Sequence, residues 1–219
     1  VDPMKSDSQI KQDILAELKW DAEIDETKIG VIVNNGAVTL TGHVPTYRQK
    51  NAAKQAAKRV GGVMSLVDNI DVRLESVHRT MDEGLAERIA NVLKWNVSIP
   101  GKEIKAEVKN GLVTLSGEVE WQYQRANILK NIEHVGGVVN IFDRITLQPR
   151  ASATDVRQRI KDALERHADI ESSRITVMAV NGTVTLSGEV ESLEEMERVE
   201  DAAWAAPGVV KVVDNLRVV

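Results

Sequence analysis

Hydrophobic and polar positions follow two different periodicities near the start of the chain. Apolar residues recur every four positions at Ile10, Ile14 and Leu18, which is the spacing that keeps side chains on one face of a helix. Ile29, Val31 and Val33 then stand at alternate positions, which places their side chains on one face of a strand. The pattern therefore predicts an amphipathic helix followed by a half-buried strand.

A tight turn and three further elements follow this strand. The pair Asn35-Gly36 tolerates the positive φ angles of a two-residue hairpin turn. Residues 37–41 alternate again, with valine and leucine on one side and threonine on the other. A helix over 47–59 and a strand that includes 70–74 complete the order α-β-β-α-β. A right-handed crossover would set the last strand parallel to the second, so we expect a mixed three-stranded sheet with two helices on one face.

The same pattern occurs three times along the chain. The motif N-G-x-V-T-L-x-G-x-V begins at Asn35, Asn110 and Asn181. The apolar helix positions, a Gly-Gly or Pro-Gly pair after the second helix and an Asp-containing last strand recur at matching offsets. A repeat of this kind indicates one structural unit used several times. The sequence therefore predicts an α+β protein of three tandem modules over residues 4–75, 79–148 and 152–219.

Two glycines of the motif recur in every module. The first completes the hairpin turn. The second lies near the end of the second strand, where we expect a bulge or a close approach between a helix and the strand. These structural glycines are Gly36, Gly42, Gly111, Gly117, Gly182 and Gly188.

These motifs resemble the BON family, the bacterial osmotically-inducible-and-nodulation domain. The resemblance rests on N-G-x-V-T-L-x-G-x-V, a helix, V-G-G-V and V-D-N-I, and it covers nearly the whole chain; module 3 departs at Ala206-Pro207-Gly208. It implies a non-catalytic role in envelope or osmotic stress. Some members of the family contact anionic phospholipid, and a cytoplasmic relative binds potassium, so the resemblance leaves both kinds of ligand open.

The residue types needed for catalysis or metal binding do not converge in the sequence. There is no cysteine, which excludes disulfides and thiolate-bound metals. His43, His78, His134 and His167 fall at different module positions. No Gly-x-Ser-x-Gly motif is present, and we interpret Ser116 and Ser187 as outward-facing strand residues. We therefore expect no enzymatic activity, no metal and no cofactor.

The second helices differ strongly in charge. Residues 4–75 are neutral overall, whereas eight basic and thirteen acidic residues give 151–219 a net charge of −5. The basic helix of module 1 and two aromatic residues of module 2 are candidates for lipid or partner contact: Arg48, Lys50, Lys54, Lys58, Trp121 and Tyr123. The acidic helix of module 3 is a candidate for self-association: Glu194, Glu195, Glu197, Glu200 and Asp201.

Three functions fit these surfaces. The leading hypothesis is a binding or scaffold protein that meets anionic phospholipid headgroups through basic side chains. The alternatives are a cytoplasmic binder of a small ligand such as potassium, and a homo-oligomer in which basic and acidic helices of different subunits meet and close a ring or extend a filament. A pI of about 5.5 argues against nucleic-acid binding.

Individual positions carry further expectations. Trp20 and Trp95 end the first helices of modules 1 and 2, where module 3 has Arg166. Trp121 stands at the N-cap position of a second helix but cannot cap it, so we expect it to pack on a neighbouring module or to contact a membrane or partner. One aspartate recurs in each last strand, and we expect it to accept backbone hydrogen bonds rather than to bind a cation. These aspartates are Asp68, Asp143 and Asp214.

The segment after Met4 is polar at once, from Lys5 to Gln9. A signal peptide would need an apolar stretch there. Unless a leader has been removed, the sequence predicts a cytoplasmic rather than a periplasmic protein.

Overall fold

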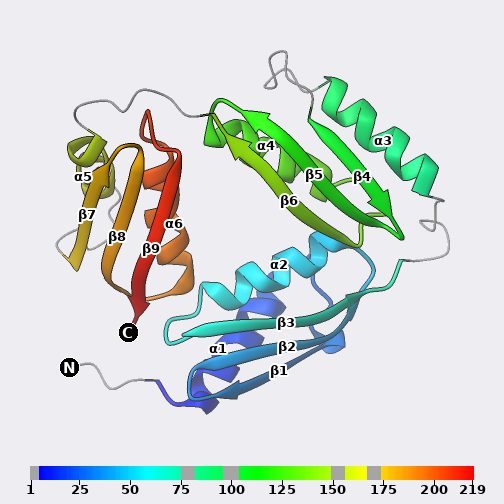
Figure 1. The fold of residues 1–219 in the computed structure, drawn as a ribbon. Coiled ribbons are helices and arrows are strands. Elements are labelled where there is room, and N and C mark those ends of the chain that lie inside the picture. The colour runs from blue at the N-terminus through cyan, green and yellow to red at the C-terminus, as the bar shows by residue number, and fades with distance from the viewer. Residues whose placement is uncertain (1–4, 75–81, 96–103, 149–155, 167–173) are drawn as a thin grey trace. The chain divides into compact units, whose positions relative to one another are not determined.

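The fold is described from a computed structural model of the chain, over residues 5–74, 82–95, 104–148, 156–166 and 174–219. It contains three separate sheets of three strands each, with the strand orders β1-β2-β3, β4-β5-β6 and β7-β8-β9. Helices accompany each sheet (Figure 1). The predicted α+β fold with three repeats of one module is confirmed. His78 and His167 lie outside the described residues.

The elements follow one another in the same order in each module. Module 1 contains α1 (Asp7–Trp20), the short 3-10 helix η1 (Glu26–Lys28), β1 (Ile29–Asn34), β2 (Ala37–Val44), α2 (Tyr47–Lys58) and β3 (Ser65–Val72). Module 2 contains α3 (Asp82–Trp95), β4 (Lys105–Lys109), β5 (Leu112–Val119), α4 (Gln122–Glu133) and β6 (Asn140–Leu147). Module 3 contains α5 (Val156–Arg166), β7 (Ile175–Val180), β8 (Thr183–Val190), α6 (Leu193–Trp204) and β9 (Lys211–Val218).

Each sheet combines both kinds of strand pairing. In module 2, β4 and β5 are antiparallel and join Val108 to Val113, whereas β5 and β6 are parallel and join Leu115 to Asp143. Module 3 repeats this pairing, with Leu186 opposite Asp214 in the parallel pair. The predicted mixed sheet is therefore confirmed, and its register brings the recurring aspartate next to the central strand.

The hairpin turns have the geometry that Asn-Gly favours. Asn35, Asn110 and Asn181 adopt φ angles of 50°, 53° and 49°, in the left-handed region that asparagine tolerates better than most residues. The second glycine of the motif marks a close approach of backbone to backbone. A Cβ atom on Gly42 would lie 2.0 Å from the carbonyl oxygen of Lys28, just before β1. The glycine thus lets β1 and β2 come together.

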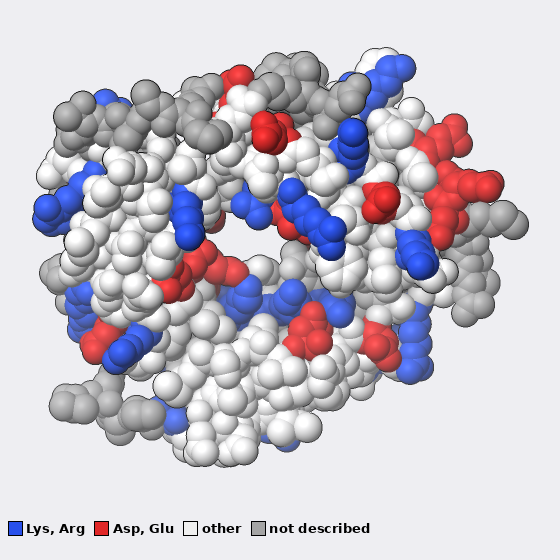
Figure 2. Space-filling view, in the orientation of Figure 1, with Lys and Arg blue, Asp and Glu red and all other residues white. Residues whose placement is uncertain are grey.

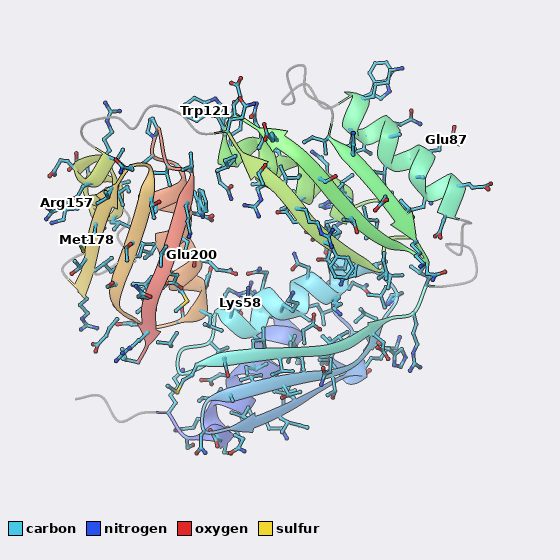
Figure 3. All side chains as sticks on the ribbon, in the orientation of Figure 1. Lys58, Glu87, Trp121, Arg157, Met178 and Glu200 are labelled. Atoms are coloured by element: carbon cyan, nitrogen blue, oxygen red, sulfur yellow. The ribbon has the colours of Figure 1, made fainter. Side chains whose placement is uncertain are left out.

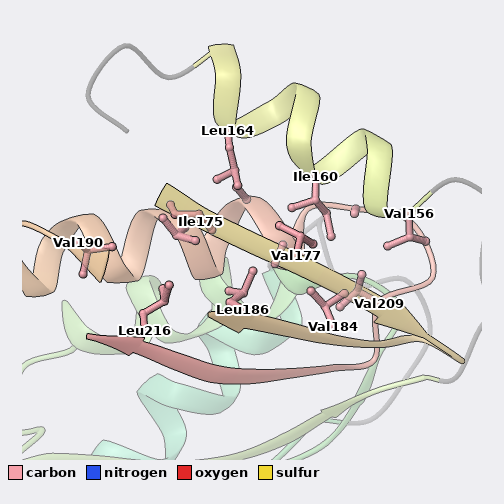
Figure 4. Close-up of a cluster of buried hydrophobic side chains, with 14 of the residues drawn as sticks. Val156, Ile160, Leu164, Ile175, Val177, Val184, Leu186, Val190, Val209 and Leu216 are labelled. Carbon is pink, nitrogen blue, oxygen red and sulfur yellow. The ribbon is translucent and has the colours of Figure 1, made fainter. Parts of the chain in front are cut away.

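An aliphatic core joins the helices to one face of each sheet. In module 3 the apolar stripe of α5 and the inward residues of β7 and β8 meet α6 in one buried cluster (Figure 4). The cluster includes Val156, Ile160, Leu164, Val177, Val184, Leu186 and Val199. The opposite face of the sheets carries partly exposed residues, among them Ile32 and Met178, which are 59% and 62% exposed.

Candidate interaction surfaces

Two large aromatic side chains project from equivalent helix ends. Trp20 is the last residue of α1 and is 88% exposed, and Trp95 is the last residue of α3 and is 77% exposed. Lys19 and Lys94 precede them and are also exposed. A lysine in the last turn interacts favourably with the negative end of the helix dipole. Modules 1 and 2 thus each present an indole and an ammonium group side by side in sequence at one helix end.

The core does not use these tryptophans. The helix faces that build the core end at Leu18 and at the partly buried Leu93, two residues before each exposed indole. The sequence signal for this surface is the repeated Leu-Lys-Trp at 18–20 and 93–95. Sequence reasoning noted the equivalence of the two tryptophans but did not treat them as a contact surface, because burial cannot be read from a single helix-end residue.

Two lysines of the basic helix make contacts within module 1. Lys50 Nζ donates a hydrogen bond to the carbonyl oxygen of Ile70 at 2.8 Å. Lys54 Nζ lies 3.7 Å from Asp68 Oδ2, with 28% and 20% of the two side chains exposed. The predicted basic row therefore also holds α2 onto β3. Its contact with lipid or a partner, including that of Arg48 and Lys58 at the two ends of α2, stays a prediction.

Trp121 and Tyr123 lie together at the start of α4. Their rings stack with centroids 6.5 Å apart and an interplanar angle of 23°, and Tyr123 is 57% exposed. The Trp121 side chain makes no capping hydrogen bond. The buried side chain of Gln124 instead reaches back to the residues at the helix start, where its Oε1 accepts the backbone N–H groups of Glu120 at 2.9 Å and Trp121 at 3.0 Å. The start of this helix thus leaves an aromatic pair at the surface (Figure 3).

Two of the three recurring aspartates, Asp143 and Asp214, accept backbone hydrogen bonds, as the sequence predicts. Asp143 Oδ1 accepts the N–H of Ile145 at 2.9 Å, and Asp214 Oδ1 accepts that of Leu216 at 2.8 Å. Both bonds form along a strand rather than in a turn. Asp143 also meets a cation, since Arg125 Nε lies 2.6 Å from its Oδ2.

The first acidic residues of α6 serve the helix itself. Ser192 Oγ accepts the N–H of Glu195 at 3.1 Å, and Glu195 Oε2 accepts the N–H of Glu191 at 2.6 Å. This reciprocal capping satisfies free N–H groups at the helix start. Glu194 pairs with Arg198 across one turn at 2.7 Å.

The later acidic residues of α6 crowd together. Burial raises the pKa of Glu200 to about 7, and the nearby charge of Asp214 and a hydrogen bond with it add to this effect (Figure 3). Burial and the charge of Glu197 also raise the pKa of Asp201. Part of the acidic surface is therefore less charged at neutral pH than its composition indicates. Its role in self-association stays a prediction.

Charges of both signs are interspersed on the face shown in Figure 2, where neither the blue nor the red side chains form one large patch among the described residues.

In the described part of the chain, no group of three or more His, Asp or Glu side chains converges to hold a metal ion. Nor does any described helix combine the length and the apolar character that crossing a membrane requires.

The repeated geometry has a counterpart among known families. The model of the BON domain matches residues 6–73, 81–149 and 152–219. The chain belongs to the BON domain family. The three matches follow the three α-β-β-α-β repeats, and the BON motif supplies the hairpin glycines and the strands described above.

Individual BON-domain relatives extend over most of this chain. Osmotically-inducible protein Y of Escherichia coli K12 is 28% identical over 193 residues, which cover 83% of this chain and 92% of the relative. The 21 kDa hemolysin of Actinobacillus pleuropneumoniae is 26% identical and covers 66% of this chain and 80% of its own. Outer membrane lipoprotein DolP of Haemophilus influenzae is 26% identical and covers 64% of this chain and 78% of its own.

A solved structure of CdsD, a structural protein of the Type III secretion system of Chlamydia trachomatis, covers 95% of this chain and 91% of its own at 16% identity, with a TM-score of 0.27.

The relatives correct one expectation. The polar segment after Met4 predicts a cytoplasmic protein, and this prediction is wrong, because the similarity to an outer membrane lipoprotein and to an osmotically inducible protein points to the cell envelope. A polar stretch reports only on the local sequence and carries no information about the compartment in which a BON module works. Two of these relatives are by name an osmotically inducible protein and an outer membrane lipoprotein, and neither name denotes an enzyme.

Proposed function

We propose that this protein is a non-enzymatic binding protein of the bacterial envelope that acts under osmotic stress and contacts anionic phospholipid through its first two BON modules. The similarity to osmotically-inducible protein Y and to DolP supports the envelope and stress setting. The observation that carries the lipid contact is the pair of exposed helix ends, Lys19-Trp20 and Lys94-Trp95. We call these the Lys-Trp ends.

The chemistry of a Lys-Trp end suits a membrane surface. Indole rings favour the interface between headgroups and hydrocarbon because one side is apolar and the N–H is polar. A lysine close to an anionic surface contributes about 1 kcal/mol. One such end would bind weakly, whereas two in one chain raise the effective concentration of the second after the first has bound.

The other candidate residues fit a supporting role. Tyr123 and Trp121 offer a second aromatic surface at the start of α4. Arg48 is exposed at the start of α2 and can approach headgroups without giving up the contacts that Lys50 and Lys54 make with β3. These residues are expected to add to the affinity that the Lys-Trp ends provide.

Vesicle flotation tests this function. We expect the full chain to float with phosphatidylglycerol vesicles at low salt, to float less at high salt, and to stay in solution with phosphatidylcholine vesicles. The double variant Trp20→Ala/Trp95→Ala should bind at least about tenfold more weakly, because it removes both interfacial anchors. Met178→Ala is the matched control, since it removes a side chain that is 62% exposed in module 3.

Two results would contradict the proposal. One is the absence of any binding to phosphatidylglycerol at low salt. The other is a double tryptophan variant that floats as well as the Met178→Ala control, which would remove the Lys-Trp ends from the contact.

A further inference from the structure

In modules 1 and 2 a cation of the second helix faces the recurring aspartate of the last strand. In module 1 this pair is Lys54 and Asp68, 3.7 Å apart. In module 2 the aspartate is Asp143, and a cation one turn earlier on the helix, Arg125, lies 2.6 Å from it. Modules 1 and 2 therefore both neutralise this aspartate with a cation of their own second helix.

Module 3 has an acid where this cation is expected. Glu200 stands two repeats after Lys54, and Asp214 stands two repeats after Asp68. Glu200 forms a hydrogen bond with Asp214, and only a protonated carboxyl group can donate a hydrogen bond to a carboxylate. The salt bridge of the other modules is thus replaced by a pair of carboxyl groups.

We propose that the third module is a proton-responsive element, in which Glu200 and Asp214 hold one proton between them at mildly acidic pH and repel each other once it leaves. With the proton, the pair joins α6 to β9 by a hydrogen bond. Without it, two negative charges face each other at the contact between the same two elements.

The surroundings of Glu200 favour the protonated form. The charged groups that act on it are Asp214 on β9 and Glu197 and Asp201 on α6 itself, and all of them are acidic. The other elements that pack on α6 contribute apolar side chains to the shared core, including Ile160 from α5 and Leu186 from β8. The groups that act directly on Glu200 therefore add repulsion, and Glu197 among them is also paired with Lys58 of α2.

The direction of the pH effect follows from linkage. The pKa of Glu200 rises from 4.5 in an ordinary environment to about 7 in the folded module. Between these two values the folded module holds a proton that the unfolded chain has lost, so its stability falls as the pH rises. The loss is complete above a pH of about 7. The raised pKa of Asp201 acts in the same direction. In modules 1 and 2 the recurring aspartate faces a cation of its own second helix rather than a second carboxyl group, so we expect the effect in module 3.

Thermal unfolding of the full chain, followed through Trp204, gives a signal specific to module 3. Trp204 packs against the core of this module, and replacing Trp20, Trp95 and Trp121 with phenylalanine leaves it as the one tryptophan of the four. We expect the midpoint to fall by about 4–8 °C between pH 5 and pH 8, the shift that a loss near 1 kcal/mol produces in a domain of this size. Glu200→Gln should keep a hydrogen-bond donor to Asp214 and remove most of this pH dependence, leaving the part that the raised pKa of Asp201 contributes.

Two further variants exchange the arrangements between modules. Glu200→Lys installs the cation of module 1 beside Asp214 and should also flatten the pH profile. Lys54→Glu, placed beside Asp68 in module 1, is the matched control and should leave the Trp204 profile unchanged. A Glu200→Gln protein with the wild-type pH profile would overturn the proposal.

A direct titration does not depend on any variant. Carbon-13 NMR of the side-chain carboxyl groups should give Glu200 a midpoint near 7 in the unaltered full chain. A midpoint near the ordinary value of 4.5 would overturn the proposal even if every variant failed to fold. This inference does not rest on lipid binding, so vesicle flotation and the titration can fail independently.

Discussion

Asp82 Oδ1, at the first residue of α3, accepts a hydrogen bond from the backbone N–H of Gly111 at 3.0 Å. The other oxygen of the same carboxylate accepts the N–H of Asn110 at 2.7 Å. Asp7 makes the same two bonds with the 35–36 turn of module 1, at 2.8 Å and 3.0 Å. One carboxylate thus joins the start of a helix to the tip of a hairpin in each of these two modules.

This contact predicts a measurable loss when the carboxylate is removed. Asp82→Ala leaves two turn N–H groups without their acceptor, and we expect module 2 to lose about 1–3 kcal/mol of stability. Hydrogen exchange of the full chain should then quicken in the hairpin of β4 and β5 and stay unchanged in module 3. Asp82→Asn keeps one acceptor oxygen, so the stability of its module 2 should lie between those of the wild type and Asp82→Ala. Unchanged exchange at Asn110 and Gly111 in Asp82→Ala would contradict the prediction.

The second glycine of the motif is expected to be far less tolerant of substitution than a glycine beside a side chain. A Cβ atom on Gly188 would lie 2.1 Å from the carbonyl oxygen of Arg174, and the backbone there has a φ angle of 141°. Gly188→Ala should therefore separate β7 from β8 and unfold module 3. Gly30→Ala is the control, since its Cβ atom would meet the Thr41 hydroxyl at 2.6 Å, which can rotate away.

Circular dichroism during heating distinguishes the two glycine variants. We expect Gly188→Ala to lose the signal of one module at low temperature, whereas Gly30→Ala keeps three modules with a small decrease in stability. Equal melting curves would show that the backbone near Arg174 moves aside easily.

Much of the fold can be predicted from local sequence because its signals are short-range. The Asn-Gly turns, the alternation around Leu40 and the spacing of Ile10, Ile14 and Leu18 each report on residues that are neighbours in the chain. The helix predicted over 47–59 is α2 (Tyr47–Lys58), which ends one residue before the predicted end. The short helix η1 was not predicted, because three residues carry no periodic pattern.

The surfaces are less predictable, because contacts across the module decide them. The spacing of Lys50 and Lys54 indicates one helix face, but it does not reveal that this face meets Ile70 and Asp68 on β3. Conversely, the exposure of Trp20 could not be read from its position at the end of an amphipathic helix. Contacts between residues that are distant in the sequence therefore decide which side chains stabilise the fold and which are exposed to a partner.

Core substitutions should destabilise a module much more than substitutions on the open sheet face. Ile160 is fully buried in module 3, and Ile160→Ala is expected to cost about 2–5 kcal/mol, because it removes apolar contacts and leaves a cavity. Met178→Ala, on an exposed side chain of the same module, should change stability by less than about 0.5 kcal/mol. Urea unfolding followed through Trp204 compares the two. A similar loss for both would mean that another surface covers Met178.

The salt bridge between Arg125 and Asp143 should make a measurable but modest contribution to the stability of module 2. The side chains are 28% and 18% exposed, so solvent screens the pair less than at a fully exposed site, and we expect a coupling energy of about 1 kcal/mol. A double-mutant cycle with Arg125→Ala and Asp143→Asn isolates this value. The Asp143→Asn single variant should cost more than Arg125→Ala, because it also weakens the bond that Asp143 accepts from Ile145.

The same cycle on Lys54 and Asp68 provides the comparison. Their atoms are 3.7 Å apart, against 2.6 Å in module 2, so the coupling should be smaller and should fall further as salt is added, because longer ion pairs depend more on unscreened charge. Urea titrations of the full chain at low and high salt measure both cycles. A larger coupling for the lysine pair would contradict the expectation that the short guanidinium bond is the stronger contact between helix and last strand.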